Sequence, residues 1–462
     1  MRIIIVVLSA FFLLTQNLSA FAAKDLKAIW DLQLLPVGYE VNCSYIKGDI
    51  AVEEIYYESR EYKGTPSRIF GYFCYPAGQK SLPAILISHG GGGTADLNNT
   101  LTWARRGYAV LSIDLPGKGQ QRMDSRSTGP NMDVPILLRT KPDPELNYLV
   151  HAVAAVRNGI TFLTQREEVD PDRIGMIGLS WGGVITLLTN GQDNRLKTAI
   201  NVFGSGYISE GCTWQDRFDI KTKQELNEWY AYIDPSIFLK TQNSPILFMT
   251  GTNDHCYYLP TFQKSYMEVS VPKKLALMPN LRHRFTPEMQ QIAFNWFDNK
   301  LKNGQGSFPQ VNIQPIFKKG ENKIIVPVLA AASGRVIEAT MYYTSGEPSR
   351  WTKRYWSSLP AYFEDGVYYF GVPTYLVDPD FMFYVSVKDD KGSITSSPIR
   401  SIFQVRLHQG ESTYAMSSPI ERINIHQPPL QVMGLPKLPD IVKLFFSKDT
   451  KTYLLKFGKE SS

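Results

Sequence analysis

Histidine and cysteine are scarce in this chain, which has six of the first and four of the second among 462 residues. No grouping of His, Cys and Asp has the spacing of a zinc site, so we expect no metal ligands. The glycines do not form the G-x-G-x-x-G turn that opens a dinucleotide-binding unit. We therefore predict a protein that works without a metal or a cofactor.

The chain also has no large excess of positive or negative residues. Lys and Arg number 49 against 43 Asp and Glu, and both signs are mixed along the chain, which has a net charge of +6. This distribution does not favour a nucleic-acid partner. Hydrophobic residues make up 43% of the sequence, which is enough for a large core and excludes a disordered chain.

Long apolar runs are missing beyond the first residues, so we expect no membrane span. Residues 3–14 are almost wholly apolar, Arg2 precedes them, and Ala20-Phe21-Ala22 follows. This pattern is typical of a secretory signal peptide cleaved after Ala22. The run is shorter than the roughly 20 residues that span a bilayer, which favours cleavage over an uncleaved anchor. We predict a signal peptide over residues 1–22 and an exported protein, periplasmic or secreted.

The four cysteines allow two disulfides in an exported protein. Cys43 with Cys74 and Cys212 with Cys256 are the pairings we consider first. Buried free thiols are an equally good alternative, and the oligomeric state is likewise open.

Residues 23–305 form the predicted catalytic domain, in which short β-rich runs alternate with helical patterns from about residue 50 to 305. Continuous apolar runs such as AILIS and AVLSID are typical of strands buried on both faces of a parallel sheet. The alternation predicts a doubly wound, mostly parallel α/β sheet. We expect strands at 53–58, 68–75, 84–88, 109–114, 173–178, 198–203, 246–250 and 274–278, and helices at 97–106, 146–166, 183–190, 259–268 and 287–302.

Two insertions interrupt this alternation, and the sequence pattern changes after residue 305. The insertions, 116–142 and 204–242, leave the carboxyl ends of predicted strands, where ligand sites of open α/β sheets form. Residues 306–405 have short alternating runs and frequent turns, which predict an antiparallel β-sandwich. Residues 406–462 are a C-terminal extension to which we assign no role.

The strongest motif is G-x-S-x-G, formed by Gly178, Ser180 and Gly182 between a predicted strand and a predicted helix. A nucleophilic serine needs a sharp, strained turn that exposes its hydroxyl, and small residues on both sides let strand and helix approach closely. We therefore predict that Ser180 is a nucleophile.

A run of four glycines, 90–93, follows His89 directly after another predicted strand. Glycines at this place let the backbone lie close to a substrate carbonyl and supply an oxyanion donor. We assign the two oxyanion donors to the backbone N–H groups of Trp181 and Gly91. A flexible glycine-rich surface loop is the alternative.

The acid and the base of a serine triad follow by order and elimination. Asp254 comes directly after the apolar strand 246–250, where the acid belongs. Asn253 carries no charge, and Asp298 lies beyond the preferred histidine. The other five histidines precede Ser180, adjoin Asp254 or lie beyond the predicted sandwich, which leaves His283 as the base.

Residues 66–303 resemble the acetyl-xylan-esterase and dienelactone-hydrolase-like branch of the α/β-hydrolases. The matching segments are SHGGGGTA (88–95), RRGYAVLSIDLPG (105–117), EVDPDRIGMIGLSWGGVITLLTNG (168–191), GTNDHCY (251–257) and the loop of His283. The resemblance implies the α/β-hydrolase fold and ester cleavage, often deacetylation of carbohydrates. The sequence departs from the pattern of that family at two places: Arg284 follows the histidine, and the glycine run stands in place of His-Gly-Tyr. These differences bear on the acyl group and the carbohydrate of the substrate, not on the triad.

Three functional hypotheses follow. The first is a serine esterase acting on a small-molecule or carbohydrate ester, whose pocket includes Trp214, Trp229 and Tyr257 as flat aromatic surfaces. The second is a peptidase of the prolyl-oligopeptidase type, although the stretch between leader and core is too short for the propeller of that family. The third is a carbohydrate-binding protein whose hydrolase domain is vestigial, which an intact triad disfavours.

Overall fold

The computed structural model describes residues 26–32, 35–118, 124–133, 137–302, 304, 307–346, 351–406 and 412–417. The predicted signal peptide and most of the C-terminal extension lie outside these residues. Within the described ranges, no helix has both the length and the apolar character that crossing a bilayer requires.

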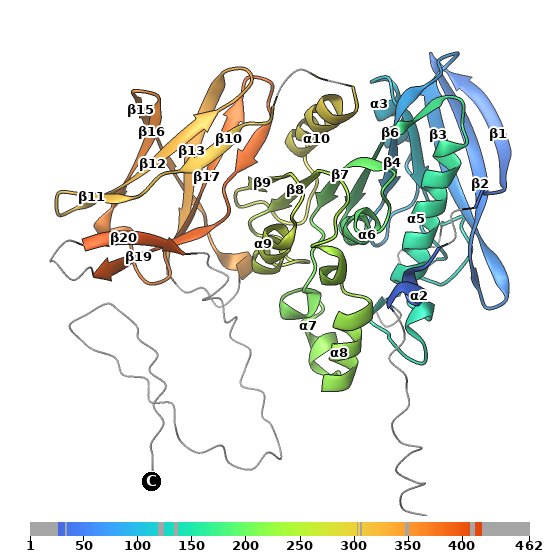
Figure 1. Cartoon of the computed structure of the whole chain (residues 1–462), viewed down its shortest axis with the longest axis horizontal. Coiled ribbons are helices and arrows are strands. Elements are labelled where there is room, and N and C mark those ends of the chain that lie inside the picture. Colours follow the sequence, from blue (N-terminus) through green and yellow to red (C-terminus); the bar gives the residue numbers. More distant parts are fainter. Residues whose placement is uncertain are drawn as a thin grey trace, which may run out of the picture.

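The N-terminal unit is built on a nine-stranded sheet in the order β1-β2-β3-β5-β4-β6-β7-β8-β9 (Figure 1). Strands β4 to β9 pair in parallel, whereas β1, β2 and β3 form an antiparallel edge joined to β5. The strands are β1 Tyr39–Lys47, β2 Ile50–Tyr62, β3 Thr65–Pro76, β4 Leu82–Ser88, β5 Ala109–Ile113, β6 Val169–Leu179, β7 Leu196–Val202, β8 Ile246–Gly251 and β9 Lys273–Met278.

Helices cover both faces of the sheet. On one face lie α3 (Leu97–Ala104) and α10 (Pro287–Leu301), where the Trp103 ring packs 4.6 Å from Phe294 and 5.4 Å from Phe297. The other face carries α5 (Tyr148–Thr164), α6 (Trp181–Asn190) and α9 (Leu259–Glu268). Because both faces are covered, every residue of β4, β5 and β8 is buried. The predicted doubly wound α/β fold is confirmed.

Two parts of this unit differ from the sequence-based expectation. Strand β1 was not predicted, since all nine of its residues are exposed at the sheet edge and show no apolar alternation. The second insertion is helical and includes η2 (Ile208–Glu210), α7 (Gln215–Asp219), α8 (Lys223–Tyr232) and η3 (Pro235–Phe238). Helix α8 begins with a capping box, in which Thr222 and Glu225 exchange hydrogen bonds, and this local signal in the sequence was missed. The remaining short elements are α2 (Leu26–Trp30) and η1 (Pro144–Leu146).

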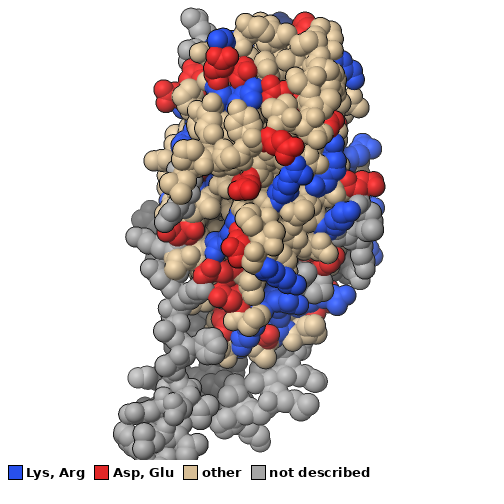
Figure 2. Space-filling model, turned by 90° about the vertical axis from the view of Figure 1, so that its right-hand side faces the viewer, with Lys and Arg blue, Asp and Glu red and all other residues tan. Residues whose placement is uncertain are grey.

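Figure 2 looks at the end of the molecule that carries β1 and β2. Acidic and basic side chains are interspersed over this face, and neither sign forms a broad field. Some of the charges on these first strands are paired, as in the ion pairs of Arg68 with Glu40 at 2.7 Å and of Arg126 with Glu54 at 2.9 Å.

Two antiparallel sheets follow α10 and pack face to face, which confirms the predicted β-sandwich (Figure 1). Their shared core is apolar and includes Val326, Met341, Phe370 and Val385. One sheet contains β10 Gln310–Ile313, β11 Phe317–Lys319, β12 Lys323–Ala331, β15 Tyr362–Glu364 and β16 Val367–Pro373. The other sheet contains β13 Val336–Thr344, β14 Ser357–Pro360, β17 Met382–Asp389, β18 Ile394–Ser396, β19 Arg400–Arg406 and β20 Ser412–Ser417. Two short 3-10 helices, η4 Trp351–Lys353 and η5 Thr374–Leu376, lie between strands. Strand β20 continues this sheet past residue 405.

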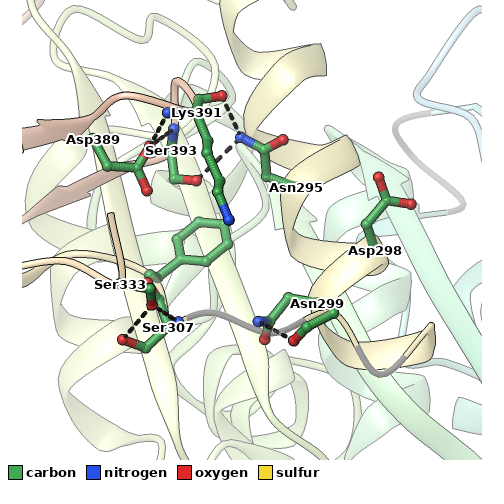
Figure 3. A pocket seen from close by; sticks show the side chains of 10 residues that line it. Asn295, Asp298, Asn299, Ser307, Ser333, Asp389, Lys391 and Ser393 are labelled. Atoms are coloured by element: carbon green, nitrogen blue, oxygen red, sulfur yellow. Dashed lines mark hydrogen bonds between the residues drawn. The ribbon is translucent and has the colours of Figure 1, made fainter. Parts of the chain in front are cut away.

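The sandwich docks directly on the hydrolase unit. Trp356, Tyr384 and Ile399 of the sandwich share one buried cluster with side chains of β8, α9 and β9. A second contact surrounds a cavity of about 180 Å³ beside the later turns of α10. Figure 3 shows the side chains that line it. There Asn295 donates hydrogen bonds to the Lys391 carbonyl at 2.9 Å and to Ser393 Oγ at 3.1 Å. Asn295, one of the polar residues that line this cavity, thus joins the two units.

The four cysteines are free thiols in the structure. Cys43 and Cys74 lie on β1 and β3, which flank β2 from opposite sides. Two strand spacings of roughly 4.8 Å put their Cα atoms beyond the reach of a disulfide. Cys212 lies opposite Tyr257 in an isolated antiparallel bridge, and Cys256 directly precedes Tyr257. Cys212 and Cys256 are nevertheless both free, so neither pairing is present in the structure.

Candidate active site

Ser180 lies on the turn between β6 and α6 with a backbone φ of 58° and ψ of −118°. An L-residue in this region is strained and persists only where the surrounding structure holds it. Here the Ser180 N–H donates to the Val202 carbonyl at 2.8 Å, and the Ser180 carbonyl accepts from Val184 N–H at 3.0 Å. The side chain is partly exposed. This is the strained, presented serine that the motif predicts.

The two flanking glycines are required by the close crossing of strand and helix. A Cβ at Gly178 would lie 2.0 Å from the Gly182 carbonyl oxygen, and one at Gly182 would lie 2.2 Å from the Ser88 carbonyl oxygen. Both neighbours are main-chain atoms, which cannot move aside as a flexible side chain does. Any larger residue would therefore displace the turn that carries Ser180.

Asp254 and His283 meet at the carboxyl ends of β8 and β9. His283 Nδ1 lies 3.0 and 2.9 Å from the two carboxylate oxygens of Asp254. The Asp254 side chain is fully buried and also accepts the backbone N–H groups of Cys256 at 2.7 Å and Tyr257 at 3.1 Å. The carboxylate is thereby held in place, and the Nδ1–H tautomer that it favours leaves Nε2 as a proton acceptor.

Ser180 and His283 both contact the chain at the end of β7, at Val202 and Phe203 respectively. Ser180 bonds to Val202, and the neighbouring Phe203 ring packs 4.4 Å from the His283 ring. Both Ser180 and His283 belong to the described part of the chain, and no hydrogen bond joins their side chains. Such a contact often tightens only when substrate binds. The structure thus brings the three predicted triad residues to one edge of the sheet.

The glycine loop lies against the serine. A Cβ built on Gly90 would be 3.0 Å from Ser180 Cβ, and one on Gly91 would be 3.0 Å from Trp181 Cδ1. His89 holds this loop, because its Nε2 accepts from Leu115 N–H at 3.0 Å while its Nδ1 lies 2.7 Å from the Gly90 carbonyl oxygen. The Trp181 N–H belongs to the first turn of α6, whose N–H groups have no partner within the helix.

An aromatic cluster of Trp181, Trp214 and Tyr257 lies beside the serine. The ring centroids are 5.0 Å apart for Trp181 and Trp214, 5.6 Å for Trp214 and Tyr257, and 5.8 Å for Trp181 and Tyr257. Trp229, the third aromatic residue predicted for the pocket, lies elsewhere. It is fully buried within the second insertion, where it packs 5.5 Å from Phe218, so it is a core residue of that insertion.

Asp254, Cys256 and His283 offer three potential metal-ligand atoms within 4.8 Å of one another. These groups are already engaged with each other, since the Asp254 carboxylate accepts from His283 and from the Cys256 main chain. Burial raises the pKa of the Cys256 thiol to about 12, and the Asp254 charge acts in the same direction. A metal binds the thiolate, which is scarce at neutral pH under these conditions. The arrangement fits an acid–histidine pair better than a metal site.

Two protein-family models match parts of the chain that contain residues of this site. The model of the acetyl xylan esterase family (AXE1) matches residues 14–210, which include the glycine loop and Ser180. These matches support a likeness to the acetyl xylan esterase-like branch of the α/β-hydrolases. The model of the prolyl oligopeptidase family matches residues 150–304 of this α/β-hydrolase, a range that contains Ser180, Asp254 and His283.

Individual relatives of this α/β-hydrolase are distant. It is 22% identical over 249 residues to the acetyl esterase Axe7A of Xylanibacter ruminicola and 24% identical over 214 residues to the putative hydrolase YtaP of Bacillus subtilis. These matches cover 51% and 43% of the chain. They span 56% and 58% of the two relatives, so the chain matches little more than half of their length.

Solved structures agree on the fold. An acetyl xylan esterase from Paenibacillus sp. R4 superposes with a TM-score of 0.50 at 24% identity, over 60% of this chain and 92% of its own. Acetyl xylan esterase 1 from Thermoanaerobacterium sp. JW/SL YS485 superposes with a TM-score of 0.50 at 18% identity, over 59% and 93%. About 40% of this chain lies outside the part that superposes on these structures.

Two features of the site were not predicted from the sequence. Asn253 and Asn280, which precede the acid and the histidine, bind main-chain groups of the sandwich. The Tyr257 hydroxyl is buried and has no hydrogen-bond partner of good geometry. Neither feature leaves a local signal in the sequence, because each depends on residues distant along the chain.

Proposed function

We propose that this protein is an exported serine esterase that cleaves carboxylic esters through an acyl-enzyme. Ser180 is the nucleophile in this proposal, and Asp254 and His283 complete the triad. The observation that carries it is the Asp254–His283 pair, at 2.9 Å, beside a serine held at φ 58°. The proposed export depends on residues 1–22, and N-terminal sequencing of the mature protein, expected to begin at Ala23, tests it.

The proposed reaction follows serine-triad chemistry. An oxygen lone pair of Ser180 forms a bond to the acyl carbon while its proton passes to His283 Nε2, and the carbonyl π electrons move to the oxygen. The backbone N–H groups of Trp181 and Gly91 then stabilise this oxyanion. The alcohol leaves with the proton from His283, and water, deprotonated by His283, releases the acid and restores Ser180.

The aromatic cluster supports a short acyl group. Trp181, Trp214 and Tyr257 fill space directly beside Ser180, and a bulky wall leaves little room for a long acyl chain. Trp214 is half-buried, so the residue is partly accessible at the surface, as an aromatic residue that stacks on a sugar would be. We therefore propose acetylated carbohydrates as the substrate class.

We expect the catalytic efficiency kcat/KM for p-nitrophenyl esters to fall at least about tenfold between acetate and octanoate, because added methylenes clash with the aromatic cluster. A chain-length series from acetate to decanoate measures this. Trp214→Ala should reduce the difference in kcat/KM between acetate and octanoate, because it removes one ring of the aromatic cluster. Trp229→Phe, a change in the core of the insertion, should leave the preference for short chains in place. Decanoate cleaved faster than acetate would contradict a short acyl pocket.

A peptidase is the second candidate, and the match of residues 150–304 to the prolyl oligopeptidase family favours it. The two functions share the triad but differ in the leaving group, an alcohol in one and an amine in the other. Acetylated xylan and proline-linked peptide p-nitroanilides, compared under the same conditions, separate them. Efficient amide cleavage with negligible ester cleavage would replace the first proposal by the second.

A further inference from the structure

The Tyr257 side chain lies inside the proposed site yet has an unused polar atom. The residue is fully buried, and its hydroxyl oxygen has no hydrogen-bond partner of good geometry. Its main chain is held firmly, since Cys212 lies opposite in a bridge and its N–H donates to Asp254 at 3.1 Å. A phenylalanine would pack equally well here, and buried polar groups without partners are rare and call for an explanation.

The surroundings of this hydroxyl indicate what it does. The Tyr257 ring lies 5.8 Å from Trp181, the residue after the nucleophile, and 6.2 Å from His283. Burial raises the pKa of Tyr257 well above its usual range, while the Ser180 hydroxyl lies close enough to interact with the phenol and acts in the opposite direction. The phenol therefore stays protonated, and it is available to donate a hydrogen bond next to Ser180 Oγ.

We propose that the Tyr257 hydroxyl is a catalytic hydrogen-bond donor to Ser180 Oγ. This inference rests on the proposed serine mechanism. As Ser180 loses its proton to His283, negative charge develops on Oγ, and a neutral donor beside it stabilises that charge. The same donor acts when the acyl-enzyme breaks and the electron pair of the C–O bond returns to Oγ, before His283 reprotonates it. The phenol proton remains on Tyr257 throughout.

The test is Tyr257→Phe, which removes only the oxygen. We expect kcat for p-nitrophenyl acetate to fall about 10- to 100-fold with KM nearly unchanged, because the donor acts on the transition state. The rate at which a fluorophosphonate probe labels Ser180 should fall similarly. The melting temperature should stay the same or rise, since an unpaired buried hydroxyl is lost.

Tyr384→Phe is the matched control. Tyr384 lies in the sandwich, is fully buried and also has an unpartnered hydroxyl, so its variant should share the stability effect without the loss of activity. Equal labelling rates in the wild type and Tyr257→Phe would overturn the inference. A wild type that the probe does not label at all would instead contradict the proposed function, so the two failures are distinguishable.

A different observation concerns the sandwich. Asn253, directly before the proposed acid, donates from Nδ2 to the carbonyl oxygens of Thr352 at 3.2 Å and Arg354 at 2.6 Å. Asn280, in the loop that leads to His283, exchanges two hydrogen bonds with the Trp356 main chain at 2.9 and 2.8 Å. A single segment of the sandwich, 352–356, thus binds both loops that carry the acid and the histidine.

The two loops are also joined to each other. Thr252 Oγ1 donates to Asn253 Oδ1 at 2.8 Å and accepts from the Asn280 N–H at 2.7 Å. The segment 352–356 closes this network from the sandwich side. We infer that the sandwich positions the Asp254–His283 pair, with Asn253 and Asn280 as positioning residues. This inference, too, depends on the proposed function.

Asn253→Ala tests the inference, with Gln263→Ala as the matched control. Gln263 on α9 also makes two hydrogen bonds to the sandwich, both with the Ile399 main chain at 3.1 and 2.6 Å, but on a helix that carries no triad residue. Both variants should have a lower melting temperature than the wild type. At a temperature where both are folded, kcat and the labelling rate of Ser180 should fall about tenfold only in Asn253→Ala, with KM unchanged. Equal losses in both variants would overturn the inference.

Discussion

Ser180→Ala is expected to lower kcat for p-nitrophenyl acetate by roughly a thousandfold or more. The variant keeps the oxyanion donors and the Asp254–His283 pair but has no atom that forms the acyl-enzyme. Alanine fits the site, since it is smaller than serine and adds no atom to the crowded turn. We therefore expect an unchanged melting temperature, together with a complete loss of labelling by the fluorophosphonate probe.

Ser67→Ala is a suitable control for this experiment. Ser67 is a buried serine on β3 whose hydroxyl has no partner, and it lies outside the proposed site. Its variant should keep both activity and labelling. If Ser180→Ala retained more than a few per cent of wild-type activity, another nucleophile or a contaminating esterase would have to be responsible.

Asp254→Asn should have the second largest effect, with kcat lowered by about 10³- to 10⁴-fold near neutral pH. The amide matches the carboxylate in shape, but its NH₂ group is a donor. Facing His283 Nδ1, it favours the tautomer whose proton is on Nε2, and that nitrogen then cannot accept the proton of Ser180. Steady-state kinetics with p-nitrophenyl acetate measure the loss.

Asp298→Asn is the control for the acid. Asp298 lies on α10 and accepts hydrogen bonds from the Tyr108 hydroxyl at 2.8 Å and from Arg106 at 2.5 Å. Losing its charge should lower the melting temperature and leave kcat nearly unchanged. The opposite result, an inactive Asp298→Asn beside an active Asp254→Asn, would contradict the assignment of the acid.

The parts of the site that were predicted from the sequence share one physical property, which is that they depend on neighbours along the chain. The crossing at Gly178 is local, because the helix after Ser180 creates it, whereas Gly182 lies against the main chain of Ser88 on another strand. Asp254 was found because it directly follows an apolar strand. His283 followed by elimination among the six histidines and from the order in which such triads occur.

The errors and omissions have a physical reason as well. Trp229 was assigned to the pocket because aromatic residues in an insertion resemble a binding surface, yet burial decides whether a ring lines a pocket or fills a core. Strand β1 is an exposed edge without apolar alternation. The disulfide pairings looked plausible along the chain, but sheet order separates Cys43 from Cys74 by an intervening strand.

The sequence by itself predicted the fold class, the strained serine and the proposed acid and histidine partners, since short-range geometry and strand order constrain all three. The tertiary structure alone decided that the Tyr257 hydroxyl is buried beside Ser180 without a partner. It also decided that the sandwich binds the loops of Asp254 and His283 through Asn253 and Asn280. Contacts between residues 76 to 101 positions apart depend on how two domains dock, and no local pattern encodes that docking.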